Sequence, residues 1–225
     1  MVIKKRRKVQ GSRLKLKNKR ILITAGPTWV PIDNVRVISN TATGETGILL
    51  SEKLKNLGAK VTLLLGQAES CCLDKKIKLI RFRFFDELKN LIEEELKSKK
   101  YDIVIHSAAV SDYKPDKFYS YKIKSGLRGL QLKLVPTQKI IDLLKIISPH
   151  SLVVGFKFEP GANKAGFVRN AENLMQRANL DLVVANLVNK NKYLAYIIQD
   201  NKFYGPMSSK KGMTDKLINL IGGSL

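Results

Sequence analysis

The chain has 225 residues, 44% of them hydrophobic, and its 41 Lys and Arg against 19 Asp and Glu give a formal net charge of +22. This length and hydrophobic fraction exclude a disordered chain and suit one α/β domain with a substantial core. No apolar run approaches the roughly 18 residues of a membrane span, so we expect no membrane partner. The positive charge raises the question of a nucleic-acid partner, and its distribution bears on the answer.

The charge is concentrated at the start of the chain. Residues 1–20 hold ten basic residues and no acidic one, so +10 of the +22 lies there. The other 205 residues carry 31 basic against 19 acidic side chains, a charge of only +12. We predict a disordered basic tail over residues 1–18 and a single folded domain over residues 19–225.

Two features of the sequence indicate where the protein resides. The basic start leads to no apolar segment of the kind a signal peptide contains. Cys71 and Cys72 are adjacent and do not fit a metal-binding or disulfide pattern. We therefore expect a cytoplasmic protein with reduced thiols.

After the tail, short apolar runs alternate with helical patterns. The apolar runs are bounded by Gly, Asp or Asn, as is typical of strands covered on both faces. The predicted strands are 20–25, 60–65, 78–82, 102–107, 152–156, 181–186 and 193–199, and the predicted helices are 45–57, 86–97, 137–147, 164–178 and 209–221. This alternation predicts an α/β, Rossmann-like, doubly wound and mostly parallel sheet.

One segment, 112–129 (DYKPDKFYSYKIKSGLRG), interrupts the alternation. It contains Pro115, two glycines, four aromatic residues and five basic residues, and it shows no helical or strand period. Loops of this length in a compact domain are usually functional or disordered. The segment follows the predicted strand 102–107, and ligands of open α/β sheets bind at the carboxyl ends of the strands. We therefore favour a lid whose lysines close on an anionic ligand, and disorder is the alternative.

The loop after the first strand carries the next signal. A dinucleotide fingerprint would need G-x-G-x-x-G in one tight turn, and a P-loop would need Gly-Lys-Ser/Thr; neither follows residues 24–28 (TAGPT). Small and hydroxylated residues instead lead into the helix at 45–57. They form either a phosphate cradle at the helix start or ordinary helix caps. The cradle residues are Thr41, Ala42, Thr43 and Gly44.

Several of these segments together resemble one enzyme family. The stretch 21–47 (ILITAGPTWVPIDNVRVISNTATGETG), followed by GAKVT at 58–62, is similar to phosphopantothenate–cysteine ligase, the ligase domain of the DNA/pantothenate metabolism flavoproteins. AAVSDY at 108–113, KIKS at 122–125 and VGFK at 154–157 recur in the family's order, and the resemblance covers about residues 19–222. The resemblance implies ligation of 4′-phosphopantothenate to L-cysteine in coenzyme A synthesis, through an acyl-nucleotidyl intermediate made with CTP or ATP.

The resemblance also implies roles for individual residues. Asn40 would hold the acyl carbonyl of the intermediate, and Lys122 would reach the phosphates from the lid. Asp112 would contact the triphosphate or its Mg²⁺. The nucleotide would further be lined by Gln138, Lys139, Ile140, Ile141, Phe156 and Lys157. Without the resemblance, Asn40 reads as a helix cap, Lys122 as a solvated charge and Phe156 as a core residue.

The sequence departs from the family's pattern at three positions. Position 125 is Ser where many bacterial relatives have a third lid lysine, and Leu174 and Ala178 stand where they have two helical lysines. Lys157 could replace a phosphate contact that those lysines make. These departures leave the choice between CTP and ATP open.

The resemblance finally implies partners. Relatives are homodimers whose sites draw on both subunits, and the flavin-dependent decarboxylase half of the bacterial enzymes has no counterpart here. We therefore expect a homodimer without flavin, and a separate decarboxylase acting on its product. Two alternatives stay open: a basic nucleic-acid-binding protein, which we do not expect because nearly half of the charge lies in the tail and the rest of the chain is only moderately basic, and a dinucleotide-dependent oxidoreductase.

Overall fold

The computed structural model describes residues 15–68, 73–160, 164–189, 192–200 and 202–225, so Cys71, Cys72 and most of the basic tail lie outside the described residues. The helices are α2 (Glu45–Asn56), α3 (Phe85–Ser98), α4 (Ile140–Ile147), α5 (Lys164–Arg177) and α6 (Lys210–Ser224). The strands are β1 (Arg20–Ala25), β2 (Trp29–Pro31), β3 (Val37–Ser39), β4 (Lys60–Leu65), β5 (Lys78–Arg81), β6 (Ile103–His106), β7 (Tyr113–Pro115), β8 (Leu134–Pro136), β9 (Leu152–Phe158), β10 (Leu182–Asn189), β11 (Lys192–Gln199) and β12 (Lys202–Met207).

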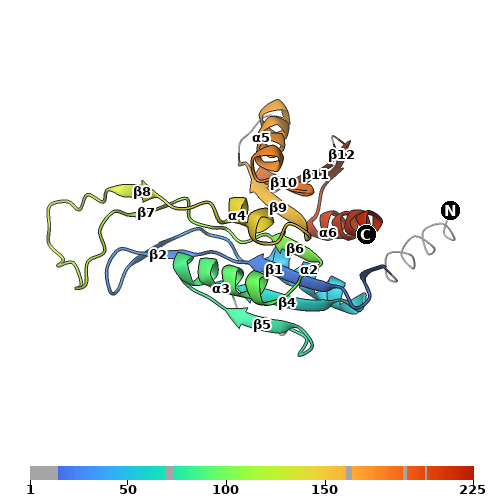
Figure 1. Cartoon of the computed structure of the whole chain (residues 1–225). Coiled ribbons are helices and arrows are strands. Elements are labelled where there is room, and N and C mark those ends of the chain that lie inside the picture. The colour runs from blue at the N-terminus through green and yellow to red at the C-terminus, as the bar shows by residue number, and fades with distance from the viewer. Residues whose placement is uncertain (1–14, 69–72, 161–163, 190–191, 201) are drawn as a thin grey trace.

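Eight strands form one central sheet in the order β12-β11-β10-β9-β6-β1-β4-β5 (Figure 1). The six strands from β10 to β5 are parallel, and β11 and β12 add an antiparallel edge. From β1 the chain moves first to β4 and β5 and then to β6, so the direction of winding reverses between β1 and β6. This is the doubly wound arrangement, and it confirms the predicted fold class.

Helices cover both faces of the sheet. Successive residues of β1 point to opposite faces, so Ile21 and Ile23 pack toward α2 and α6 while Leu22 packs toward α3, α4 and α5. The apolar faces of the helices supply the other half of each core, for example Leu54 of α2 and Leu88 of α3. Burial of the central strands on both faces explains why their sequences are continuously apolar.

The structure differs from the sequence-based expectations at both ends. Leu16, which we assigned to the disordered tail, is fully buried, and the Asn18 amide donates to the carbonyl oxygen of Gly58 at 2.9 Å. Residues 15–18 therefore belong to the folded part of the chain. The strand β12, which we did not predict, pairs with β11 near the other end of the chain.

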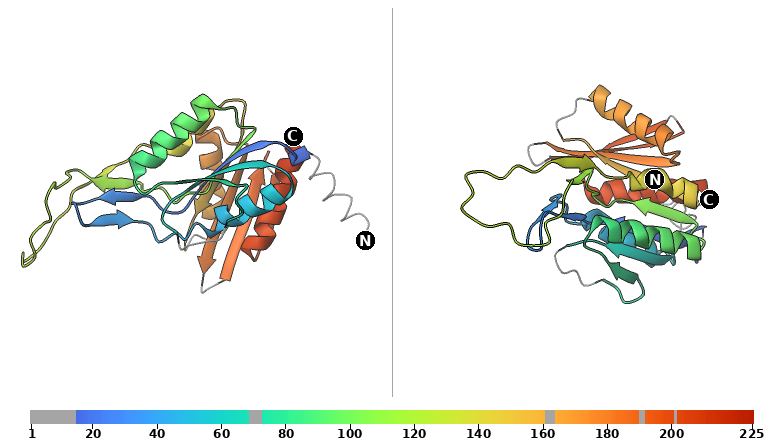
Figure 2. Two further views of the ribbon diagram at one scale, coloured as in Figure 1. Left: turned by 90° about the horizontal axis from the view of Figure 1, so that it is seen from below. Right: turned by 60° about the vertical axis from the view of Figure 1, so that its left-hand side comes forward.

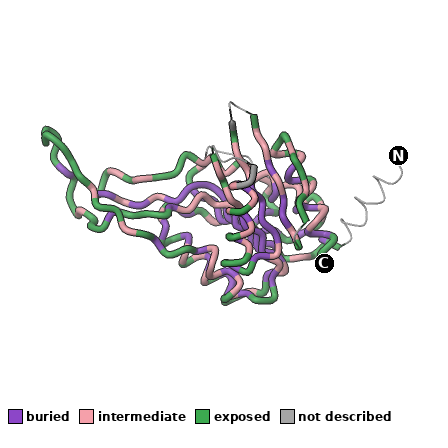
Figure 3. The backbone as a smooth tube through the Cα atoms, turned by 90° about the horizontal axis from the view of Figure 1, so that it is seen from above, coloured by how far each residue is buried: buried purple, intermediate pink, exposed green. Residues whose placement is uncertain are grey.

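Two antiparallel projections leave the central sheet on the same side. The hairpin (residues 29–39) carries β2 and β3, and the arm (residues 113–136) carries β7 and β8 joined by a long loop. Figures 1 and 2 show them extending side by side away from the sheet, and Figure 3 shows that the arm's loop is largely exposed. The prediction that residues 112–129 lack strand structure is therefore wrong at the base of the arm, where residues 113–115 pair with 134–136.

Candidate functional site

A cavity of about 920 Å³ lies at the carboxyl ends of β1, β6 and β9, beside the point where the winding reverses. Open α/β sheets bind their ligands at this position. The polar, charged and glycine-rich parts of its wall include Asn40–Gly47, His106, Asp112, Thr137–Ile141, Phe156–Glu159, Asn170, Asn173, Leu174, Arg177, Asn186, Tyr193 and Lys210. Apart from Lys122, all the predicted site residues are in this set.

The start of α2 faces the cavity. Gly44 precedes the helix with a φ of +75°, which a residue with a side chain rarely adopts, and no side chain of the described residues caps this helix in the usual way. A Cβ on Gly47 would lie 2.3 Å from the Cβ of Ala25, so only glycine lets the helix start approach β1 this closely. The helix therefore starts beside the cavity with no side chain at its N-cap position, and the Glu45 amide donates to the hydroxyl of Thr43 at 3.4 Å. A phosphate cradle at residues 41–44 stays a prediction.

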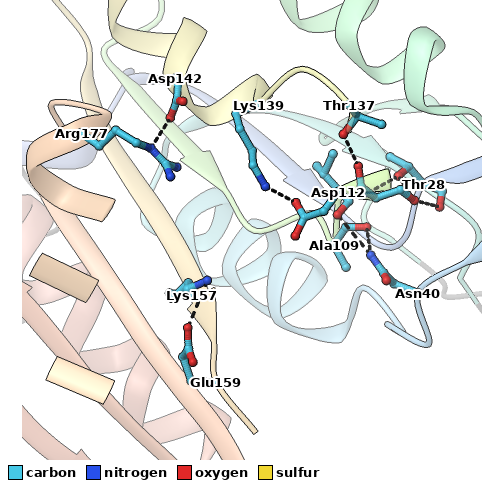
Figure 4. A network of polar contacts seen from close by, with 12 residues as sticks. Thr28, Asn40, Ala109, Asp112, Thr137, Lys139, Asp142, Lys157, Glu159 and Arg177 are labelled. Atoms are coloured by element: carbon cyan, nitrogen blue, oxygen red, sulfur yellow. Dashed lines mark hydrogen bonds and ion pairs between the residues drawn. The ribbon is translucent and has the colours of Figure 1, made fainter. Parts of the chain in front are cut away.

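Asn40 joins the loop after β3 to the loop after β6. Its side-chain nitrogen donates to the carbonyl oxygens of Ala109, at 3.0 Å, and Val110, at 3.2 Å (Figure 4). Both amide hydrogens are thereby engaged, and the side-chain oxygen is the atom left to accept a hydrogen bond. Asn40 is therefore not a helix cap in this structure.

Asp112 and Lys139 form an ion pair inside the cavity, with 2.6 Å between Oδ1 and Nζ (Figure 4). The loop that carries Asp112 is braced on both sides. The Ser111 amide donates to the hydroxyl of Thr28 at 2.9 Å, and the Thr137 hydroxyl donates to the carbonyl of Ser111 at 2.6 Å. The pair thus has a fixed base, while both its side chains are exposed to the cavity.

Thr137 also explains a wrong boundary. We predicted a helix from residue 137, but α4 begins at Ile140. The Thr137 amide donates to the carbonyl of Asp112 at 2.9 Å, which holds Thr137 beside the neighbouring loop instead of in a helical turn. Gln138 and Lys139 therefore lie in an extended segment along the cavity wall.

The β9 end of the cavity holds a second and a third charge pair. Lys157 pairs with Glu159 at 3.1 Å, and Arg177 of α5 pairs with Asp142 of α4 at 3.2 Å (Figure 4). Phe156 lies next to Lys157 and is half-buried in the wall.

The two helical positions that depart from the family's pattern are part of the core. Leu174 and Ala178 are 8% and 3% exposed and pack against the sheet. Their apolar character is therefore consistent with the packing of α5. Arg177 is the cation that this helix presents to the cavity.

His106 is a buried histidine at the end of β6. Its Nδ1 lies 2.8 Å from the hydroxyl of Thr24, and burial lowers its pKa to about 4. The ring is therefore neutral at ordinary pH, because burial in an apolar strand disfavours its charged form.

Lys122 lies on the arm, where it is exposed, and it is not among the residues that line the cavity. The arm carries it away from the central sheet (Figure 2). Its predicted contact with the phosphates of a nucleotide stays a prediction.

The polar residues of the cavity that were not predicted from the sequence include Asn170, Asn173, Asn186, Tyr193 and Lys210. Asn170 and Asn173 lie one helical turn apart on α5, a spacing that could have indicated a shared polar face. Tyr193 stands out because its hydroxyl is buried and has no hydrogen-bond partner within the described residues. Burial, and then the carboxylate of Glu45, raise the pKa of Tyr193 to about 12.

The described residues contain no group of three or more His, Cys, Asp or Glu side chains placed to hold a metal ion. Asp112, Glu45 and Glu159 line the cavity without forming such a group, so Mg²⁺ bound at Asp112 would need further oxygen ligands from the substrate, as Mg²⁺ at phosphates commonly does. The same part of the chain includes no helix with the length and apolar character needed to cross a membrane.

The fold and the cavity define a Rossmann-like α/β domain with its candidate site at the reversal of winding. The chain belongs to the family described as the DNA/pantothenate metabolism flavoprotein C-terminal domain, which matches residues 16–222. This match confirms the family resemblance found in the sequence.

Individual relatives agree with this assignment. The chain is 41% identical over 171 residues to a coenzyme A biosynthesis bifunctional protein CoaBC of Thermococcus kodakarensis, a match that covers 76% of this chain and 42% of that protein. It is 37% identical over 172 residues to a cysteine/cysteine sulfinic acid decarboxylase of an unknown prokaryotic organism, covering 76% of this chain and 46% of that protein. The chain therefore spans less than half the length of these relatives.

A solved structure extends the agreement to three dimensions. The DNA/pantothenate metabolism flavoprotein from Streptococcus pneumoniae superposes with a TM-score of 0.83 at 25% identity. The match covers 92% of this chain and 100% of that one.

Proposed function

We propose that this chain ligates 4′-phosphopantothenate to L-cysteine in coenzyme A synthesis, at the expense of a nucleoside triphosphate, CTP or ATP. The observation that carries the proposal is that one cavity gathers all the residues except Lys122 that the family resemblance assigns to the nucleotide and the acyl intermediate. They come from four separate segments, the loops after β3, β6 and β8 and the end of β9. The relative named for coenzyme A biosynthesis supports the same pathway.

The reaction has two steps. In the first, a carboxylate oxygen of phosphopantothenate attacks the α-phosphorus, and the bond to the leaving pyrophosphate breaks. In the second, the cysteine amine attacks the acyl carbon, loses a proton, and releases the nucleoside monophosphate. Both partners of the first step are anions, so their approach needs positioned cations and hydrogen-bond donors.

The described residues can supply these groups. The start of α2 offers backbone N–H groups to a phosphate, and Lys139, Lys157 and Lys210 bring positive charge to the cavity. Each of these lysines is paired with a carboxylate, Lys139 with Asp112, Lys157 with Glu159 and Lys210 with Glu45. A polyphosphate that displaces these carboxylates would form ion pairs with the three lysines in their place.

Asn40 would act on the acyl group. Its two amide hydrogens are bound to the carbonyls of Ala109 and Val110. To hold an acyl carbonyl, one of these hydrogens would have to leave its carbonyl and turn to the ligand. Mg²⁺ arriving with the triphosphate would offset phosphate charge, with Asp112 as the protein carboxylate within reach.

Pairing of two copies of this chain would explain why Lys122 lies outside the cavity of its own chain. The hairpin and the arm expose many large apolar side chains, a pattern that marks an interaction surface. These side chains are Val35, Val37, Tyr113, Phe118, Tyr121, Leu127, Leu130 and Leu134. In a homodimer that covers this surface, the arm of one copy could bring Lys122 to the cavity of the other.

The test is pyrophosphate release from purified protein with phosphopantothenate, L-cysteine, Mg²⁺ and either CTP or ATP, run in parallel. We expect release that depends on both phosphopantothenate and the nucleotide, and formation of phosphopantothenoylcysteine by mass spectrometry. No release with either nucleotide would refute the proposed function.

The role of Lys122 and the homodimer can be tested together. We expect Lys122→Gln to lower turnover at least about 100-fold, the order found when a group that stabilises transition-state charge is removed. Lys117→Gln, an exposed lysine of the same arm, is the matched control and should retain activity. Mixing Lys122→Gln with Asn40→Ala under subunit exchange should restore part of the activity if Lys122 acts across copies; no recovery despite exchange would contradict that arrangement.

A further inference from the structure

Asp33, at the tip of the hairpin, has a completely buried carboxylate although it lies outside the central sheet. Oδ1 accepts hydrogen bonds from the amides of Val35, at 2.8 Å, and Arg36, at 2.7 Å. Oδ2 accepts from the amide of Ile123, at 3.1 Å, and from the guanidinium of Arg36. Two of these bonds fold the hairpin's turn, and the one from Ile123 reaches the arm.

These bonds keep Asp33 ionised. Burial by itself would raise the pKa of this carboxyl, but the hydrogen bonds from Ile123, Val35 and Arg36 outweigh it and lower the pKa to about 2. A carboxylate with several N–H donors is a strong and directional acceptor. The contact between hairpin and arm is therefore made by a charge at every ordinary pH.

The contact lies beside Lys122. The Arg36 guanidinium also donates to the carbonyl of Ile123, at 3.3 Å from both of its terminal nitrogens, so both backbone groups of Ile123 are held by the hairpin. The Tyr119 amide donates to the carbonyl of Ile32 at 3.1 Å. Ile123 is 8% exposed, whereas its neighbours Lys122 and Lys124 are exposed.

Beyond this point the arm has few attachments to the hairpin. Around Gly126 and Gly129 an added Cβ would meet nothing within 4 Å. A further bond lies within the arm itself, toward its base, where the Asp116 amide donates to the carbonyl of Lys133 at 2.9 Å. The hydrogen bonds to the backbone of Ile123 therefore fix the middle of a segment that is largely exposed to solvent.

We propose that Asp33 is the positioning residue that fixes the Lys122-bearing part of the arm in the orientation needed for turnover. The inference rests on the proposed function for its kinetic consequence, but its structural content does not. Asp33 does not touch the substrate; it acts through the backbone of Ile123, one residue from Lys122.

Asp33→Asn is the first variant. It keeps the shape of the side chain but replaces one acceptor oxygen by an NH2 group, which would face N–H donors instead of accepting from them. We expect faster hydrogen exchange at the Ile123 amide by at least tenfold. We also expect kcat to fall at least tenfold with little change in KM for the nucleotide, while the melting temperature of the central domain changes little.

A double variant separates positioning from a general structural role. If Asp33 acts through Lys122, adding Asp33→Asn to Lys122→Gln should lower kcat no further, whereas independent effects would multiply. Asp116→Asn is the matched control, because Asp116 is an exposed carboxylate of the same arm that pairs with Lys133 at 3.3 Å. It should leave both kcat and the exchange of Ile123 unchanged.

Ile123→Pro is the second variant, for use if Asp33→Asn does not fold. It removes the arm's N–H donor and leaves Asp33 and the central sheet intact, and it should reproduce the loss in kcat. Unchanged exchange at Ile123 in a folded Asp33→Asn protein, or multiplicative effects in the double variant, would overturn the proposal. If the wild-type protein releases no pyrophosphate, the proposed function fails, while the exchange experiment still decides whether Asp33 holds the arm.

Discussion

The two ends of the central sheet both carry a polar cavity, yet they are built differently. The cavity at the amino end has about 760 Å³ and is lined by six basic residues: Arg20, Lys55, Lys60, Lys76, Lys78 and Lys99. The cavity at the carboxyl end is larger, at about 920 Å³, and mixes small residues, amides and paired charges. By density of positive charge alone, the amino end would be the better candidate for a phosphate site.

The difference lies in where the cations find their partners. At the amino end, Lys78 and Lys99 donate to the buried carboxylate of Glu95, at 2.9 and 2.6 Å, and the Tyr101 hydroxyl donates to it as well. Burial opposes ionisation of Glu95, but these three hydrogen bonds lower its pKa to about 2. These lysines therefore stabilise the fold, because their charge is used by a group inside the protein.

At the carboxyl end the pairs face the cavity and are exposed to a ligand. The Asp112 and Lys139 side chains are 63% and 45% exposed, so a polyanion can replace the carboxylate at little cost. The start of α2 adds backbone donors beside a glycine, which has no side chain to cap them. A ligand site is thus marked by groups with unused or exchangeable hydrogen-bonding capacity, and the number of cations is a poor guide to it.

The largest expected effect that separates the two ends is on catalysis. Asn40→Ala at the carboxyl end should lower turnover by about 10² to 10³-fold, the effect of losing one positioned polar group at a reacting centre. Asn56→Ala at the amino-end cavity is the matched control and should retain activity within about twofold, since surface changes away from a site are near neutral. Steady-state pyrophosphate release measures both. Equal losses in the two variants would remove the functional distinction between the two cavities.

An intermediate effect is expected on stability. Glu95→Gln leaves Lys78, Lys99 and Tyr101 without their charged acceptor, and should cost about 1–3 kcal/mol of unfolding free energy. Activity per folded molecule should stay the same. Urea denaturation at neutral pH gives the loss, and Glu93→Gln, which removes a more exposed ion-pairing carboxylate of the same helix, serves as the control.

The same variant has a pH signature. The folded-state pKa of Glu95 is about 2, below the ordinary value of 4.5, so its ionised form stabilises the protein above pH 4.5 and this contribution is lost as the pH falls toward 2. Glu95→Gln should therefore flatten the acid limb of the stability profile between about pH 4.5 and 2. An unchanged acid limb would show that the ionisation of Glu95 does not contribute to stability.

The smallest effect is expected at a solvent-exposed cation of the amino-end cavity. Lys60 is exposed at the first position of β4. Lys60→Gln should change the unfolding free energy by less than about 0.5 kcal/mol and turnover by less than about twofold. A larger loss of turnover would mean that the amino end also binds a ligand needed for the reaction.

The central fold was predictable because its signals are local. Buried parallel strands such as β1, β4 and β10 are continuously apolar, and the glycine after α2 ends a helix whose apolar residues share one face. The hairpin and the arm were not predictable, because each of their strands is only three residues long, too short to show the alternation of a strand or the period of a helix. Their structure depends on contacts between distant segments, such as Asp33 with Ile123.

The candidate site shows the same division. Asn40, Asp112 and the segment 138–141 could be proposed because the sequence around them resembles a known enzyme family, which implied their roles. The asparagines of α5 and the buried hydroxyl of Tyr193 could not, since each becomes notable only when the sheet brings its element to the cavity. The position of Lys122 relative to the cavity is likewise a property of the arm's direction, which no local pattern encodes.

The contact between Asp33 and Ile123 joins residues that are 90 positions apart in the chain. During synthesis the hairpin therefore emerges long before the segment that it holds. Closing so long a loop costs entropy that is regained only when the strands between them are in place. The arm is thus expected to dock late in folding, after the central sheet, and until then the amides of Val35 and Arg36 bind an Asp33 carboxylate that still lacks its partner from the arm.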